Sequence, residues 1–140
     1  MLTHAREKAL RQSVRLLVAD AYDLHRVPGE FDGGLAMFWL SHVPRARLRA
    51  FLDGLHERLE PGAIVFLGDN VYVPGVGGDL LPPDEAGDTY KLRRLADGGR
   101  YRVLKNYYSE KELRDLLAPG TSDLAVRVGT HFWSASYRAR

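Results

Sequence analysis

Polar side chains that follow apolar runs are the first candidates for chemistry in this sequence. Asp20, His42 and the pair Asp69 and Asn70 each stand at or just beyond the end of such a run. If the runs are parallel strands, these side chains lie at the carboxyl edge of a sheet, where ligands of open α/β sheets bind. Asp69 and Asn70 could then orient a substrate hydroxyl or amine, or equally cap the next turn. An imidazole titrates near neutrality, so His42 could be a general base, or could have only a structural role.

Two adjacent tyrosines form a further candidate for substrate binding. Tyr107 and Tyr108 stand just before Ser109, which opens a predicted helix. The irregular stretch 71–88 lies upstream of them, and loops of that length are usually functional or mobile. The tyrosines could line a substrate pocket or pack beneath the loop, and we expect packing for one of the two.

The composition excludes several kinds of site. The 140 residues contain no cysteine, which excludes thiolate zinc sites, iron–sulfur clusters and cysteine nucleophiles. No two of the five histidines have the spacing of metal ligands on a helix, so we expect no metal. No apolar run is long enough to span a bilayer, and the first residues do not resemble a signal peptide. A cytoplasmic protein without a membrane partner is therefore expected.

The charge is unevenly distributed along the chain. The net charge is +2, but acidic side chains predominate in residues 1–88 and basic ones in residues 89–140. A basic surface could attract an anionic partner. Such charge is more often simply solvated, so nucleic acid is not the expected partner.

The elements that must position these residues follow from periodicity, Pro and Gly punctuation and caps. They are a helix over 1–11, a strand over 14–19, a mostly buried strand over 31–40, a helix from Pro44 to about Glu60, a strand over 63–68 covered on both faces, a hairpin over 89–95 and 101–105, a capped helix from Ser109 to Leu117, and antiparallel strands over 124–128 and 131–137. Strands that alternate with helices predict an α/β fold with a mixed, mostly parallel sheet and antiparallel end strands.

Four stretches in this order resemble a known family. They are VRLLVADAYDL, FDGGLAMFWLSHVP, FLDGLHERLEPGAIVFLGDN, and YRVLKNYYSEKELRDLLAP followed by HFWSASY. Together they are similar to the carboxyl-terminal two-thirds of a class I S-adenosylmethionine-dependent methyltransferase of the small bacterial type. The resemblance implies a Rossmann-like fold and methyl transfer from S-adenosylmethionine to an O or N atom of a small molecule.

The resemblance also implies roles for four residues at the cofactor. The carboxylate of Asp20 would accept from the adenine amine, and the backbone N–H of Ala21 would donate to the ring; the alternative is that Asp20 only starts a turn. Phe38 and Trp39 would lie beside the sulfonium, where aromatic faces attract a cation. Alternatively, one of these two aromatic residues fills the core.

The sequence departs from the family at its amino-terminal end. The family's glycine-rich loop is absent, as is the acidic residue that ends its second strand, and MLTHAREKA resembles the helix that follows that acid. We therefore expect residues 1–140 to be a single, partial methyltransferase domain that is truncated at its amino terminus, with Met1 an internal methionine. Residues 71–108 are expected to be a loop and hairpin insertion within it.

This departure has two expected consequences. The chain should bind the cofactor weakly or not at all, and the strand over 14–19 should lack its neighbours, which leaves an exposed sheet edge open to self-association. The alternative to a methyltransferase is a non-catalytic domain of the same fold that serves binding or assembly. A binder of anionic ligands or nucleic acid that uses the basic half is a third hypothesis.

Overall fold

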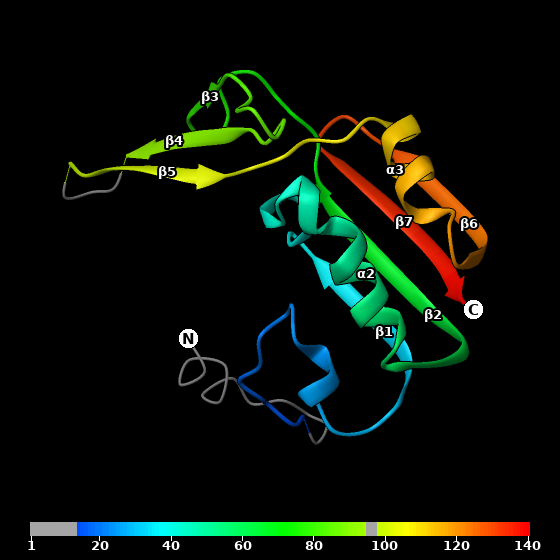
Figure 1. Cartoon of the computed structure of the whole chain (residues 1–140). Helices are drawn as coiled ribbons and strands as arrows, with labels where there is room; N and C mark the ends of the chain where they lie inside the picture. The colour runs from blue at the N-terminus through cyan, green and yellow to red at the C-terminus, as the bar shows by residue number, and fades with distance from the viewer. Residues whose placement is uncertain (1–13, 95–97) are drawn as a thin grey trace.

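A mixed four-stranded sheet forms the centre of the molecule (Figure 1). The computed structural model describes residues 14–94 and 98–140. The strand order is β1-β2-β7-β6, in which β1 and β2 are parallel and the other two pairings are antiparallel. The strands are β1 (Phe31–Met37), β2 (Leu59–Asn70), β7 (Phe132–Ala139) and β6 (Thr121–Val128). The mixed sheet agrees with the expected α/β fold.

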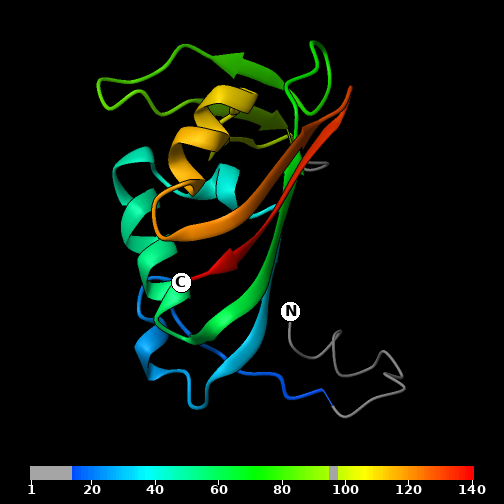
Figure 2. The ribbon, with the colours of Figure 1, turned by 90° about the vertical axis from the view of Figure 1, so that its right-hand side faces the viewer.

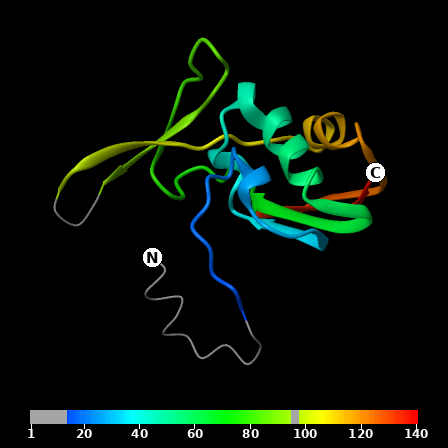
Figure 3. The same cartoon turned by 60° about the horizontal axis from the view of Figure 1, so that its bottom comes forward.

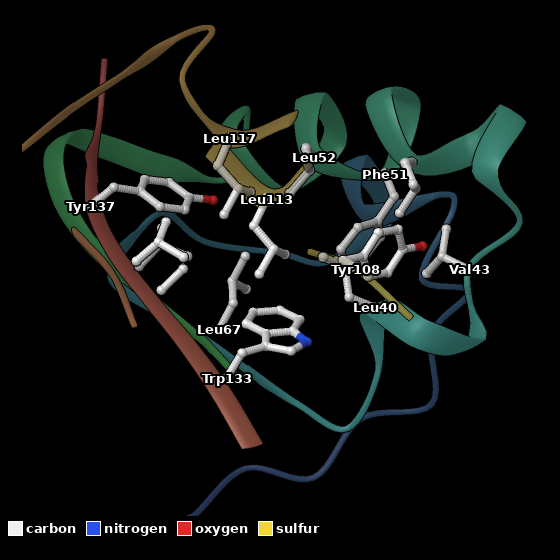
Figure 4. Packing of buried hydrophobic residues seen from close by; sticks show 14 residues of the cluster. Leu40, Val43, Phe51, Leu52, Leu67, Tyr108, Leu113, Leu117, Trp133 and Tyr137 are labelled. Atoms are coloured by element: carbon white, nitrogen blue, oxygen red, sulfur yellow. The ribbon is translucent and has the colours of Figure 1, made fainter. Parts of the chain in front are cut away.

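Two α-helices cover one face of this sheet, α2 (Leu48–His56) and α3 (Glu110–Leu117). Figure 2 shows both helices on the same side of the strands. The core lies between the two layers, and Figure 4 shows how its aromatic and aliphatic side chains interlock. Its fully or nearly fully buried members include Leu40, Val43, Leu52, Val65, Leu67, Leu113, Leu117, Trp133 and Tyr137.

The start of α3 follows from local sequence chemistry. The hydroxyl of Ser109 accepts from the backbone N–H of Glu112, and the Glu112 carboxylate accepts from the backbone N–H of Ser109. This reciprocal capping box satisfies two backbone donors that a helix start otherwise leaves unpaired. The predicted cap is confirmed, and it aims Leu113 and Leu117 into the core.

A second, three-stranded antiparallel sheet projects from the body of the molecule (Figure 3). It consists of β3 (Asp79–Leu81), β4 (Tyr90–Arg94) and β5 (Arg100–Leu104). The predicted hairpin is confirmed, since β4 and β5 pair in register from Tyr90 with Leu104 to Arg94 with Arg100.

The predicted strand over 14–19 is wrong. These residues have no strand structure, and Val18 is 87% exposed. The physical reason is that a strand forms against a neighbour: the expected neighbours of this segment are missing, and among the described strands β1 pairs with β2 alone. The predicted helix over 1–11 lies outside the described residues.

The predicted burial of the first two strands is also wrong. Leu35 of β1 is 72% exposed, and Ile64 and Phe66 of β2 are 54% and 41% exposed. Both described α-helices lie on the other face, so the alternate side chains of these strands meet solvent. The helix from Pro44 is shorter than predicted, because a 3₁₀ turn precedes α2 and β2 already begins at Leu59. No described helix is long and apolar enough to cross a membrane.

Candidate functional site

Two hollows open at the carboxyl ends of the parallel strands β1 and β2. The first, the β1 pocket, has a volume of about 660 Å³. It is lined by Ala19, Asp20, Ala21, Tyr22, Leu35, Ala36, Met37, Trp39, Phe51 and Leu55. The second, the β2 pocket, has a volume of about 250 Å³. It is lined by Asn70, Val71, Val73, Val76, Gly77, Lys91, Arg93, Lys105, Tyr107, His131 and Phe132.

The β1 pocket brings together three of the four predicted cofactor residues: Asp20, Ala21 and Trp39. One carboxylate oxygen of Asp20 accepts from the backbone N–H of Tyr22 at 2.9 Å, so the side chain is held in a turn. Among the described residues, no partner accepts from the backbone N–H of Ala21. Asp20 therefore takes part in a turn, as its alternative role predicts, and the backbone N–H of Ala21 beside it has no acceptor in the described part of the chain.

These residues fit the adenine end of a nucleoside cofactor. The pocket offers a carboxylate acceptor at Asp20, a backbone donor at Ala21, and apolar walls from Met37, Trp39 and Phe51. The indole Nε1 of Trp39 is buried and has no hydrogen-bond partner in the described part of the chain. A buried donor without a partner costs free energy.

Phe38 is not among the lining residues of the β1 pocket. Its ring meets that of Phe132 edge to face, with centroids 6.0 Å apart, and Phe132 lines the β2 pocket. The cause is local backbone geometry. Phe38 has φ +55° at the end of β1, and its N–H donates to the carbonyl of Gly68 at 2.8 Å. A bulky residue rarely adopts this conformation, which concentrates at functional sites.

Gly68 of β2 has a packing requirement at the same place. A Cβ built there would lie 2.8 Å from Cε and 3.0 Å from Sδ of Met37. Any larger residue would push the Met37 side chain, which lines the β1 pocket. The two pockets are therefore linked through consecutive residues, with Met37 facing one and Phe38 packed against the wall of the other.

A buried ion pair lies at the carboxyl end of β2. The ammonium of Lys105 donates to Asp69 Oδ1 at 2.8 Å, to Ser41 Oγ at 2.7 Å and to Asn70 Oδ1 at 3.1 Å. Asp69 also accepts from the backbone N–H groups of Ser41 and Asn70. Asp69 and Lys105 are 1% and 4% exposed, so each uses the other as its counter-ion.

The carboxylate of Asp69 is stabilised in its charged form. Burial alone would raise its pKa, but the hydrogen bonds from Lys105 and from the backbone of Ser41 and Asn70 outweigh burial and lower the pKa. Asp69 is too deeply buried to touch a ligand in the β2 pocket. Its effect there is indirect, because through Lys105 it holds the side-chain oxygen of Asn70, which does line the pocket.

Tyr107 is the predicted tyrosine that reaches the β2 pocket. Its ring packs edge to face against that of Tyr72, with centroids 5.3 Å apart. Burial raises its pKa, with smaller effects from Arg93, which lowers it, and from Asp69 and Tyr72, which raise it. The phenol therefore stays protonated at neutral pH and can both donate and accept.

Tyr108 and His42 lie elsewhere. Tyr108 is 6% exposed and belongs to the core, which agrees with packing for one of the two tyrosines. Nδ1 of His42 donates to the carbonyl of Leu104 at 2.7 Å, so this imidazole ties its own 3₁₀ turn to the end of β5. His42 lines neither the β1 nor the β2 pocket.

Sequence analysis missed Lys105 and Ser41 as partners of Asp69. A signal was present, because a lysine within the apolar context of "VLKNYY" is a candidate for burial, and a buried lysine needs a carboxylate. Its partner stands 36 residues away, and local spacing cannot identify a contact at that separation. No group of three or more potential metal ligands occurs among the residues that the structure describes.

No protein-family model and no curated protein matches the sequence. Among solved structures, the DhpI-SAM-HEP complex is 26% identical to this chain with a TM-score of 0.64, and the match covers 86% of this chain and 55% of that one. The chain thus spans about half the length of DhpI.

Two further structures extend the likeness to nearly the whole chain. The PH0226 protein from Pyrococcus horikoshii OT3 is 15% identical with a TM-score of 0.75, and the match covers 99% of this chain and 66% of that one. An S-adenosylmethionine-dependent methyltransferase from Clostridium acetobutylicum ATCC 824 is 14% identical with a TM-score of 0.65, covering 99% and 69%. The mixed sheet, the pockets at its carboxyl edge and these likenesses together show that the chain has the Rossmann-like α/β fold of the class I S-adenosylmethionine-dependent methyltransferases.

Proposed function

We propose that this chain forms the acceptor side and part of the cofactor side of an S-adenosylmethionine-dependent methyltransferase that acts on an O or N atom of a small molecule. The β1 pocket takes the adenine end of the cofactor and the β2 pocket takes the methyl acceptor. The observation that carries the proposal is the position of both pockets at the carboxyl ends of two adjacent parallel strands, joined through Met37 and Phe38. Residues 71–108, proposed as an insertion, supply the outer wall of the β2 pocket.

The residues of this chain contribute by positioning. When bound, S-adenosylmethionine supplies an electrophilic methyl group on a sulfonium. Asp20 and Ala21 fix the adenine, and the ring of Phe38 offers a face to positive charge near the junction of the pockets. Asn70 and Tyr107 orient the acceptor atom for in-line attack, and holding two reactants in line is itself a large part of the rate enhancement.

The general-base role of His42 remains part of the proposal for an acceptor whose reacting atom extends beyond the lining of the β2 pocket, since His42 lines neither pocket. Because Nδ1 of His42 donates to the Leu104 carbonyl, Nε2 is the nitrogen free to accept a proton in the neutral ring. His42→Gln should lower the rate of methyl transfer without changing the affinity for S-adenosylhomocysteine. An unchanged rate would remove His42 from the reaction.

The adenine assignment is tested by binding of S-adenosylhomocysteine, followed through tryptophan fluorescence, to which Trp39 at the pocket and Trp133 in the core both contribute. We expect weak binding, with a dissociation constant of about 1 mM, because the β1 pocket holds only one end of the cofactor. Asp20→Ala should abolish the fluorescence change. Asp23→Ala is the matched control, since Asp23 is a nearby carboxylate that pairs with His25 and Arg26 and does not line the β1 pocket. Equal affinities of the two variants would contradict the proposal.

A second candidate function is a non-catalytic binding or assembly domain of the same fold. The observation that favours it is the exposed apolar face formed by Leu35, Ile64 and Phe66. A face of this kind is typical of a surface that another polypeptide covers. S-adenosylhomocysteine separates the two candidates, because an assembly domain has no reason to bind it at Asp20.

A further inference from the structure

The ionisable side chains that line the β2 pocket are basic, apart from the neutral phenol of Tyr107. They are Lys91, Arg93, Lys105 and His131, and the lining contains no Asp or Glu. The charge of Lys105 is matched by Asp69, which lies behind it. The charges of Lys91 and Arg93 remain unmatched at the pocket. The pocket therefore carries a positive field, which a ligand of opposite charge would neutralise.

Lys91 is a buried cation that has no carboxylate partner in the part of the chain that the structure describes. It is 1% exposed, and among the described residues its ammonium donates only to two backbone carbonyls, of Val76 at 3.0 Å and of Gly78 at 2.7 Å. Its charge also lies 5.0 Å from the ring centroid of Tyr72. Burial lowers its pKa, opposed by Asp79 at longer range and reinforced by Arg93. Buried charges are normally paired, and residues 14–94 and 98–140 supply no counter-ion in contact with Lys91.

The backbone that receives Lys91 cannot easily change. Gly78 has φ +95°, and a Cβ there would collide with the carbonyl oxygen of Leu92. The loop therefore packs closely against β4 at Gly78, and the Gly78 carbonyl accepts from the ammonium of Lys91. This construction places the ammonium at the wall of the β2 pocket and not in solvent.

Arg93 presents a second cation on the same side of β4. Residues two apart in a strand face the same way, so Lys91 and Arg93 share a face while Arg94 lies on the other. Among the described residues, no carboxylate or hydrogen-bond acceptor holds the guanidinium of Arg93. A guanidinium offers a planar fork of donors that suits a carboxylate or a phosphate group.

We infer that the methyl acceptor is a small molecule with an anionic group, a carboxylate or a phosphate-type group, which Lys91 and Arg93 bind in the β2 pocket. That the bound anion is the methyl acceptor rests on the proposed function. The anion site itself rests only on Lys91 and Arg93. A volume of about 250 Å³ admits a compact molecule of a few carbon atoms beyond the charged group. Tyr107 and Asn70 then remain to orient the atom that receives the methyl group.

The test is a titration of the whole chain, without cofactor, followed by amide NMR. The probes are ethyl phosphate, propionate and uncharged 1-propanol. We expect saturable shifts at Gly77, Gly78 and Tyr107 with at least one anion, and none with 1-propanol. The comparison of the first two probes tells phosphate from carboxylate. The absence of saturable shifts with either anion would overturn the inference.

Two arginine variants make the test specific. Arg93→Gln should weaken anion binding about tenfold, the value of one charge-assisted hydrogen bond. Arg94→Gln removes the same charge one residue along β4, on the opposite face, and should leave binding unchanged. Equal effects of the two variants would show only general attraction to a basic hairpin and would contradict the site.

Lys91→Met provides an independent check. It removes the buried ammonium and should also weaken anion binding, while its fold is monitored in the same spectra. If the Lys91→Met variant does not fold, the effect of Arg93→Gln on anion binding still tests the site. The outcome is separate from the proposed function, because anion binding without any binding of S-adenosylhomocysteine would contradict the adenine site at Asp20 and leave the anion site standing.

Discussion

At the scale of single residues, the pair Asp69 and Lys105 sets the geometry of the acceptor side. The ammonium of Lys105 lies 2.8 Å from the carboxylate of Asp69 in the interior. It also donates to Ser41, in the turn after β1, and to Asn70, at the end of β2, and so ties these two segments together. Sequence analysis identified Asp69 and Asn70 through their position after a strand. It could not identify Lys105 as their partner, since the contact depends on how β5 returns to the sheet.

Removing Lys105 should show how much this ion pair contributes to the free energy of unfolding. Lys105→Met leaves the Asp69 carboxylate buried without a cation, and we expect a loss of about 3 kcal/mol in the free energy of unfolding, measured by urea denaturation. Lys111→Met is the control, because its ion pair with Asp115 is exposed to solvent and should contribute little to stability. A stable Lys105→Met variant would show that Asp69 is protonated or solvated.

The same pair should determine the stability in acid. The pKa of Asp69 is lower in the folded chain than its ordinary value, so the unfolded chain binds the proton more readily. The stabilisation is complete above the ordinary value, about pH 4, and is lost as the pH falls through the lower folded pKa. Denaturation of the wild type and of Asp69→Asn across this range checks the sign. The variant should show a smaller decrease in acid, and parallel curves would contradict the assignment.

At the scale of elements, α3 holds the segment that carries Lys105 and Tyr107 against the sheet. Its capping box depends on Ser109. Ser109→Ala should destabilise the chain by about 1 kcal/mol, and Ser109→Gly by only a few tenths of a kcal/mol. Thermal or urea unfolding of both variants measures the difference. Equal losses for the two variants would show that something other than the cap accounts for the effect.

The elements that sequence analysis predicted correctly are those defined locally. The cap at Ser109, the hairpin over 89–105 and the final antiparallel pair carry their own signals in turns, caps and alternation. The strand over 14–19 and the double burial of β2 were wrong because both depend on neighbours in space. The ring of Phe38 was assigned to the cofactor side, and only the observed backbone, with φ +55°, shows that it turns toward Phe132.

At the scale of the whole molecule, one face of the sheet is uncovered in the described part of the chain. Leu35 lies beside Phe66 in the register of β1 and β2, with Ile64 two residues before Phe66 on the same side. Exposed apolar side chains on a sheet, next to the open edge of β1, favour association between copies. Self-association through this region is a proposal that can be measured directly.

Sedimentation velocity at increasing protein concentration tests this association. We expect the wild-type chain to shift to larger species as its concentration rises, and the double variant Ile64→Lys, Phe66→Lys to remain a monomer. Tyr101→Lys is the matched control, because Tyr101 is also exposed but lies on β5, away from the sheet face. A wild-type chain that stays monomeric throughout would remove the proposal.

The central claim is that the carboxyl edge of β1 and β2 is a methyl-transfer site with its adenine end at Asp20. The most direct measurement is a map of the amide NMR shifts caused by S-adenosylhomocysteine. The account predicts shifts concentrated at Asp20, Ala21, Met37 and the Trp39 indole, with none at Gly120, which lines a separate hollow beside His56. Shifts that are absent at saturating ligand, or that cluster away from the β1 pocket, would contradict it.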